Sequence, residues 1–230
     1  MAEIIEISRI ALHDQVVARL RTMLVEGRIA PGAKLNERTL SEQLRVSRTP
    51  LREAIKLLAA EGLVDLLPNR GAIAVKLTEA DVLDTFEVLA ELEGLSGELA
   101  ARRIPDERLS ELRALHYEML ACFERQDLSG YYRLNAQIHT LINEAAANPV
   151  LIGTYKSINA RVQSLRFRTN QDAAKWKSAI KEHELMLEAI TARDASALRQ
   201  ILVQHLNNKR DSVLTLMRSG DLYHLANLAT

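Results

Sequence analysis

The stretch VSRTPLREAIKLLAAEGLV, from residue 46 to residue 64, limits the fold more than any other part of the chain. Ser47 stands where a helix N-cap is expected, and Pro50 is tolerated because it lies in the first helical turn. At helical spacing two faces separate. One face is apolar and consists of Leu51, Ala54, Ile55 and Leu58. The other face is polar, lies near the helix start and consists of Arg48, Thr49, Arg52 and Lys56.

The segments around this helix predict a small domain with a hairpin. Two amphipathic segments precede it, at about 12–27 and about 37–44, with a turn at residues 30–32 between them. Two short aliphatic runs follow it, at 63–67 and 72–77, and the turn residues PNRG separate them. Helix, helix, helix and hairpin together predict a winged helix-turn-helix over residues 1–78.

The polar face suits contact with DNA. An arginine offers two parallel donors to the O6 and N7 atoms of guanine, and Thr49 can touch a thymine methyl group or a phosphate. Residues 1–78 carry 12 Lys and Arg against 9 Asp and Glu, a balance of +3, and the rest of the chain carries −3. The alternatives are a basic face that only contacts solvent and a winged domain that binds protein. The combination of helices and wing favours DNA.

From Thr78 onward the pattern is helix after helix, so the fold is expected to be mostly α. Thr78 and Asp81 have the spacing of a capping box, which starts a helix that breaks near Pro105. Five more amphipathic segments follow, at about 106–125, 128–147, 149–170, 174–193 and 195–217. We therefore expect an antiparallel helical domain over residues 79–218 and a C-terminal tail over residues 219–230.

Three histidines and one asparagine are expected to meet inside the helical domain. Asn135 and His139 are four residues apart and share a helix face. His183 and His205 lie equally far from the turn at Asp194, each roughly 16 Å along its helix, so they face each other at one level. Three imidazoles and an amide oxygen suit zinc or another transition metal. The alternatives are ordinary helix histidines and a metal-dependent hydrolase.

Other features indicate a soluble protein of the cytoplasm. The N-terminus carries acids where a signal peptide carries basic residues, and no apolar run reaches the length of a membrane span. The single cysteine, Cys122, has no partner for a disulfide and is expected to fill a helix.

The run LNERTLSEQLRVSRTPLREAIKLLAAEGLVDLLPNRGAIAV resembles the DNA-binding domain of GntR-family bacterial transcriptional regulators. The resemblance implies that Arg38, Ser47, Arg48, Thr49 and Arg52 contact phosphates and bases. It also implies that the wing tip, formed by Arg70 and Gly71, reaches the minor groove.

Residues 79–218 are similar to the FCD effector domain of one branch of that family, in a shorter variant with six helices. The similarity rests on the pair Asn135 and His139 and on the histidines of KEHELMLEAITARD and LVQHL, and it implies a divalent metal at the centre of the domain. Relatives commonly carry aspartate where this chain has Asn135, which is expected to weaken or change metal preference.

Relatives also often carry an arginine near the position of Leu89, so another cation is needed to hold a ligand carboxylate. Arg161, Arg166 and Arg168 are candidates because arginine grips a carboxylate with two hydrogen bonds, and we favour Arg161.

The sequence thus predicts a homodimeric transcriptional regulator, expected to be a repressor. It is expected to bind a near-palindromic double-stranded operator, since two-fold symmetry in the protein calls for two-fold symmetry in the DNA. A small carboxylate effector in the helical domain is expected to change operator affinity.

Overall fold

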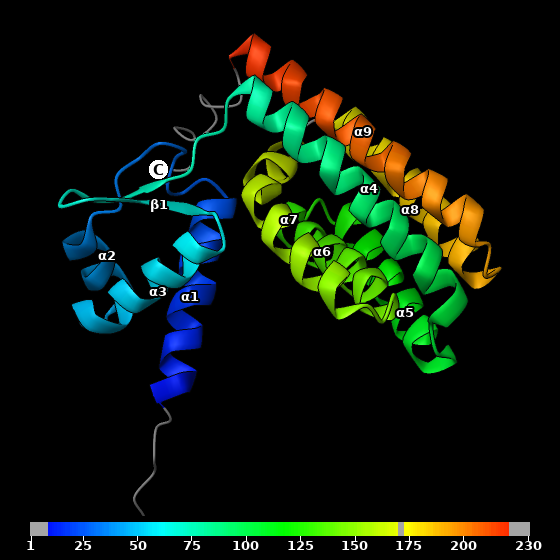
Figure 1. Cartoon of the computed structure of the whole chain (residues 1–230), viewed down its shortest axis with the longest axis horizontal. Helices are drawn as coiled ribbons and strands as arrows, with labels where there is room; N and C mark the ends of the chain where they lie inside the picture. Colours follow the sequence, from blue (N-terminus) through cyan, green and yellow to red (C-terminus); the bar gives the residue numbers. More distant parts are fainter. Residues whose placement is uncertain (1–8, 170–172, 221–230) are drawn as a thin grey trace, which may run out of the picture. The chain divides into compact units, whose positions relative to one another are not determined.

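The computed structural model describes residues 9–169 and 173–220. The chain divides between Lys76 and Leu77 into an N-terminal domain and a helical domain, each with its own contacts. The two domains are described separately below (Figure 1). In the described residues no helix is long and apolar enough to cross a membrane.

The N-terminal domain is the predicted winged helix-turn-helix. Three helices, α1 (Arg9–Val25), α2 (Glu37–Leu44) and α3 (Arg48–Ala60), precede the strands β1 (Val64–Leu67) and β2 (Gly71–Ala74). Asn36 caps α2, because its side chain accepts hydrogen bonds from two backbone N–H groups of the first turn. The apolar face of α3 is buried as the sequence predicts, by Leu51, Ala54, Ile55 and Leu58. Burial of this face leaves the basic face outside.

The wing differs from the prediction in two ways: its second strand ends earlier, and a third segment pairs with it. β1 and β2 pair antiparallel from Val64 opposite Ala74 to Leu67 opposite Gly71, so β2 ends three residues before the predicted position. A preceding segment adds to the sheet, since Leu35 donates its N–H to the carbonyl of Ala72 at 2.8 Å. That segment follows the turn at residues 30–32 and carries no strand pattern of its own, which is why its pairing was not predicted.

The helical domain contains six described helices that match the predicted segments closely. Their bounds are α4 (Glu79–Arg103), α5 (Asp106–Glu124), α6 (Leu128–Ala145), α7 (Pro149–Thr169), α8 (Ala173–Thr191) and α9 (Ala195–Ser219). The capping box at Thr78 and Asp81 and the cap at Asp194 are both present. Gly220 ends α9 with a φ of 80°, and residues 221–230 of the predicted tail lie outside the described residues.

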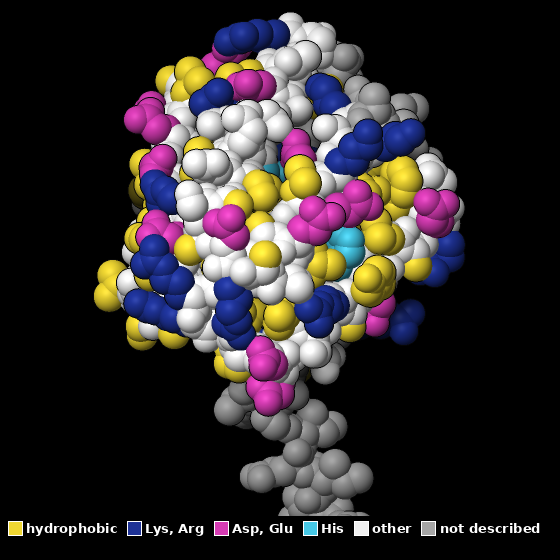
Figure 2. Space-filling model, turned by 90° about the vertical axis from the view of Figure 1, so that its right-hand side faces the viewer, with side chains coloured by type: hydrophobic (Ala, Val, Ile, Leu, Met, Phe, Trp, Pro, Cys, Tyr) yellow, Lys and Arg dark blue, Asp and Glu magenta, His cyan; other side chains and the backbone are white. Residues whose placement is uncertain are grey.

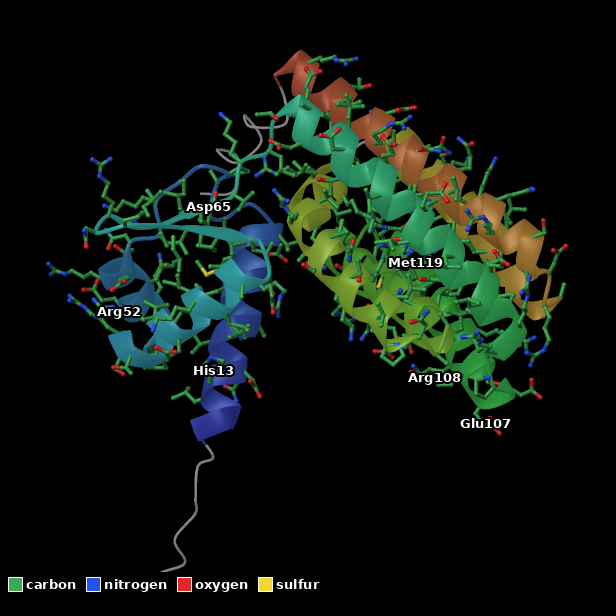
Figure 3. All side chains as sticks on the ribbon, in the orientation of Figure 1. His13, Arg52, Asp65, Glu107, Arg108 and Met119 are labelled. Carbon is green, nitrogen blue, oxygen red and sulfur yellow. The ribbon has the colours of Figure 1, made fainter. Side chains whose placement is uncertain are left out.

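Two glycines let α4 and α9 lie side by side at close range (Figure 1). A Cβ atom on Gly97 would lie 2.3 Å from Leu202 Cδ1, and one on Gly94 would lie 2.7 Å from Val203 Cγ2. Most of the buried residues of the domain are aliphatic or aromatic, and Met119 of α5 is fully buried in its interior (Figure 3). The close approach brings His205 of α9 to the middle of the domain.

We predict that Gly97→Ala destabilises the helical domain by about 1 to 3 kcal/mol, because the added methyl group overlaps Leu202 across a close helix contact. The control is Gly153→Ala on α7, where an added Cβ meets nothing within 4 Å. That change is expected to stabilise by up to about 1 kcal/mol, since alanine favours helix more than glycine does. Fluorescence of the single tryptophan, Trp176, reports unfolding of this domain alone. Equal stability of the two variants would contradict the prediction.

Candidate functional site

The basic face of α3 lies open to solvent. Ser47 occupies the N-cap position in an extended conformation, but its hydroxyl makes no capping hydrogen bond. This departs from the capping role that the sequence suggests and leaves the hydroxyl available to a ligand. The other residues predicted to contact DNA are exposed as well: Arg38, Arg48, Thr49, Arg52, Arg70 and Gly71.

Two of these arginines are held by carboxylates on α2. The Nε atom of Arg52 donates to Glu37 at 2.8 Å, and the Nε atom of Arg38 donates to Glu42 at 3.2 Å. Figure 3 shows Arg52 on the side of α3 that faces away from α1. Exposed pairs of this kind contribute about 0 to 1 kcal/mol, so a phosphate can replace the carboxylate at little cost. Within the described residues, Arg48 and Arg70 take part in no ion pair.

The wing tip has the backbone conformation that close approach to a groove needs. Asn69 and Gly71 adopt positive φ values of 58° and 87°. The intervening Arg70 donates its N–H to the carbonyl of Leu67 at 3.0 Å, which closes a tight loop. The loop therefore presents the Arg70 side chain at its outer end.

The helical domain brings together the three predicted histidines. His139 of α6, His183 of α8 and His205 of α9 have ring centroids 5.1 to 5.3 Å apart. One ring nitrogen from each lies within 4.8 Å of the others, and all three residues are buried. We call this group the histidine cluster. Asn135 is buried one helical turn before His139 on the same face of α6.

Two carboxylates fix the orientation of two of these rings. The Nδ1 atom of His139 lies 2.9 Å from Oε2 of Glu93, and the Nδ1 atom of His205 lies 2.5 Å from Oε2 of Glu182. A carboxylate on Nδ1 holds the proton there and leaves the lone pair of Nε2 free to bind a metal. In the described part of the chain, Nε2 of His205 and both ring nitrogens of His183 are buried without a hydrogen-bond partner.

Burial also keeps His183 and His205 neutral, which metal binding requires. Burial and the neighbouring His139 hold the pKa of both His183 and His205 well below the usual range. Burial opposes ionisation of Glu93, but His139 and Arg166 beside it outweigh that effect and lower its pKa to about 2. Three buried imidazoles, two of them kept neutral, beside the ionised carboxylate of Glu93 form a donor set that fits zinc or a related ion.

The favoured arginine is not at the cluster. Arg161 is exposed on α7, whereas Arg166 on the same helix is buried, with its Nη2 atom 3.3 Å from Nε2 of His139. The two arginines are five positions apart, so they point to different sides of the helix. Arg168 is also buried. The structure therefore places Arg166, and not Arg161, beside the histidines.

Two charged residues of the site were missed at the sequence level. Glu93 lies four residues after Leu89 and seven after Phe86, so it falls on the buried stripe of α4. Lys209 lies four residues after His205 on α9 and is buried; burial and the nearby Arg166 lower its pKa to about 7. A charged residue in an otherwise apolar stripe was the available signal in both cases.

Comparison with known protein families agrees with this division of the chain. Residues 12–73 match the family described as "Bacterial regulatory proteins, gntR family". Residues 84–208, more than half of the chain, match the FCD domain. The two matches cover the winged domain and the histidine-containing domain respectively.

Individual relatives resemble nearly the whole chain. The HTH-type transcriptional repressor RspR of Escherichia coli is 27% identical, over 88% of this chain and 89% of its own length. The Nta operon transcriptional regulator of Aminobacter aminovorans is 29% identical, over 86% of this chain and 92% of its own length. The gluconate operon transcriptional repressor of Bacillus subtilis is 25% identical, over 94% of this chain and 90% of its own length.

Solved structures share the fold. The E. coli protein McbR/YncC has a TM-score of 0.76 at 23% identity, and the match covers 94% of this chain and 99% of that one. A GntR-type protein from Rhodococcus sp. RHA1 has a TM-score of 0.73 at 18% identity, and the match covers 89% of this chain and 98% of that one.

Proposed function

Since the chain belongs to the GntR family of bacterial regulatory proteins, in its FCD branch, we propose that it is a metabolite-responsive repressor. The family and its homologues are transcription regulators and not enzymes, so the hydrolase alternative is set aside. We infer that it acts in the cytoplasm as a homodimer on a near-palindromic operator. The observation that carries the proposal is a histidine cluster with unpaired nitrogens beside a buried arginine.

We infer that the exposed face of α3 enters the major groove. Arg48 and Arg52 are proposed to contact bases, and Arg38 is proposed to contact a phosphate from α2. Ser47, Thr49 and the wing residues Arg70 and Gly71 complete the proposed surface. The exposure of all seven residues supports this assignment.

We infer that the effector site is the histidine cluster. His139, His183 and His205 would supply three nitrogen ligands and Asn135 an amide oxygen, while positions left open would accept an oxygen of a small organic acid. A divalent metal would supply Lewis acidity for that oxygen, and the surrounding residues would orient the acid. The face shown in Figure 2 carries acidic and basic side chains interspersed, with no large patch of basic side chains alone.

Regulation requires that the dimer has two arrangements and that the effector binds one of them with higher affinity than the other. RspR and the gluconate operon protein are both named as repressors, which supports repression, rather than activation, by this chain.

The arginines of the winged domain are expected to differ in effect. Arg48→Ala or Arg52→Ala should cost roughly 1 to 3 kcal/mol of operator binding and relax specificity, because a base contact is lost. Arg38→Ala should weaken binding to the operator and to unrelated DNA about equally. It should also reduce the slope of the logarithm of the binding constant against the logarithm of the salt concentration by about one. Titration of labelled DNA at several salt concentrations measures both effects. Arg102→Ala in the helical domain removes the same charge as a control.

The assignment of α3 fails if Arg48→Ala and Arg52→Ala both leave operator affinity unchanged. Binding that hardly depends on salt would instead favour a protein partner for the winged domain.

A second experiment tests the effector site. Native mass spectrometry with metal analysis identifies what the purified protein carries, and operator titrations follow with that metal and a series of small carboxylates. An active carboxylate should lower operator affinity about 5- to 150-fold, the usual range of coupling between sites. His205→Gln should abolish the response and keep DNA binding, whereas the exposed neighbour Gln204→Ala should retain both. A full response in His205→Gln would rule out the cluster.

A further inference from the structure

The guanidinium group of Arg166 divides its hydrogen bonds between an anchor and the histidine cluster. Its Nη1 atom donates to Oδ1 of Asn159 at 2.8 Å and to Oε1 of Glu93 at 3.3 Å. Its Nη2 atom lies 3.3 Å from Nε2 of His139. The side chain is only 4% exposed, so water does not compete for these contacts.

These contacts define which atom of His139 carries the proton. A guanidinium group has donors only, so Nε2 of His139 must accept the hydrogen bond from Arg166. The ring proton then lies on Nδ1, which is 2.9 Å from Oε2 of the Glu93 carboxylate. Arg166 therefore uses the single free lone pair of His139.

A metal in the histidine cluster would need that same lone pair. One lone pair cannot serve both partners, and a divalent cation repels a guanidinium group a few ångströms away in a buried site of low dielectric constant. Metal binding and the contact between Arg166 and His139 therefore exclude each other. The Nη1 contacts with Asn159 and Glu93 do not involve the lone pair, so they hold Arg166 at the site in either case.

We propose that Arg166 binds the carboxylate of the effector and thereby makes metal and carboxylate binding cooperative. This inference rests on the proposed function of the same site. When a metal takes Nε2 of His139, Nη2 of Arg166 loses its acceptor and is free to donate to a carboxylate. A carboxylate that draws Nη2 away frees the lone pair in turn, so each ligand strengthens the other by the same factor.

The buried charges favour an anionic ligand in the metal-bound site. Glu93 and Arg166 cancel each other, and Glu182, which contacts His205, balances one of the two charges of a divalent ion. One positive charge of the ion then remains. An enclosed excess charge is costly unless it is paired, and a carboxylate supplies the pairing.

The test measures Co²⁺ binding to the full-length protein without DNA, by calorimetry and by the visible spectrum of the bound ion. Each titration is run in acetate and in chloride at equal ionic strength, with correction for Co²⁺ binding by acetate in solution. Acetate should raise the Co²⁺ affinity of the wild-type protein roughly 5- to 150-fold.

Arg166→Met should bind Co²⁺ more tightly than the wild type in chloride, because the competing donor and its charge are gone. Its gain in acetate should be several-fold smaller than that of the wild type. Arg161→Met, an exposed change on the same helix, is the matched control and should behave as the wild type. The double variant Glu93→Gln with Arg166→Met avoids an unpaired buried carboxylate, and it should also have a reduced acetate effect.

A purely structural role for Arg166 gives the opposite pattern, with weaker Co²⁺ binding in Arg166→Met and an unchanged acetate effect. That result, or wild-type Co²⁺ binding that acetate does not alter, would overturn the cooperativity and leave the DNA-binding function intact. Failure of the wild type to bind Co²⁺ would remove the metal from the proposed function, and this inference with it.

Discussion

The contacts of the buried Glu93 carboxylate are the interactions on which the arrangement of the helical domain depends. It joins three helices, because Glu93 of α4 contacts His139 of α6 and both Tyr155 and Arg166 of α7. A buried charge costs several kcal/mol unless its hydrogen bonds are satisfied, so this arrangement is stable only when the three helices are in register. The same carboxylate orients the first ring of the histidine cluster. One residue, Glu93, therefore both holds the three helices together and positions a histidine of the site.

The N-terminal domain obtains its basic surface by a different route. There the apolar face of α3 packs into the core and its arginines remain exposed. Arg52 pairs with Glu37, and Arg48 takes part in no ion pair with the residues that the structure describes. An exposed ion pair is exchanged easily for a phosphate, whereas the buried pair of Arg166 and Glu93 holds its geometry. The chain thus uses arginine in two ways, as an adaptable contact on the surface and as a fixed donor in the interior.

The sequence predicts the elements of this fold well and the partners of buried charges poorly. Periodicity and caps suffice for α2, α4 and the turn at Asp194, because those signals are local. The equal distances from that turn also predict the meeting of His183 and His205, since two joined helices keep register. The bridge between Lys34 and Ile73 was not predicted, because it depends on the position of β2. Arg161 was preferred to Arg166 because sequence alone does not fix which side of α7 faces inward.

The ligand set has a consequence for the choice of metal. Within the described residues, the groups that meet are three imidazoles, with the Asn135 amide one turn away, and the nearby carboxylates lie behind the rings on Nδ1. Glu93 and Glu182 therefore return negative charge to the site without occupying a coordination position, and they make the imidazoles stronger donors. We infer that three imidazole nitrogens together with the amide oxygen of Asn135 would favour zinc, cobalt or nickel over magnesium and calcium, which prefer a full set of oxygen ligands.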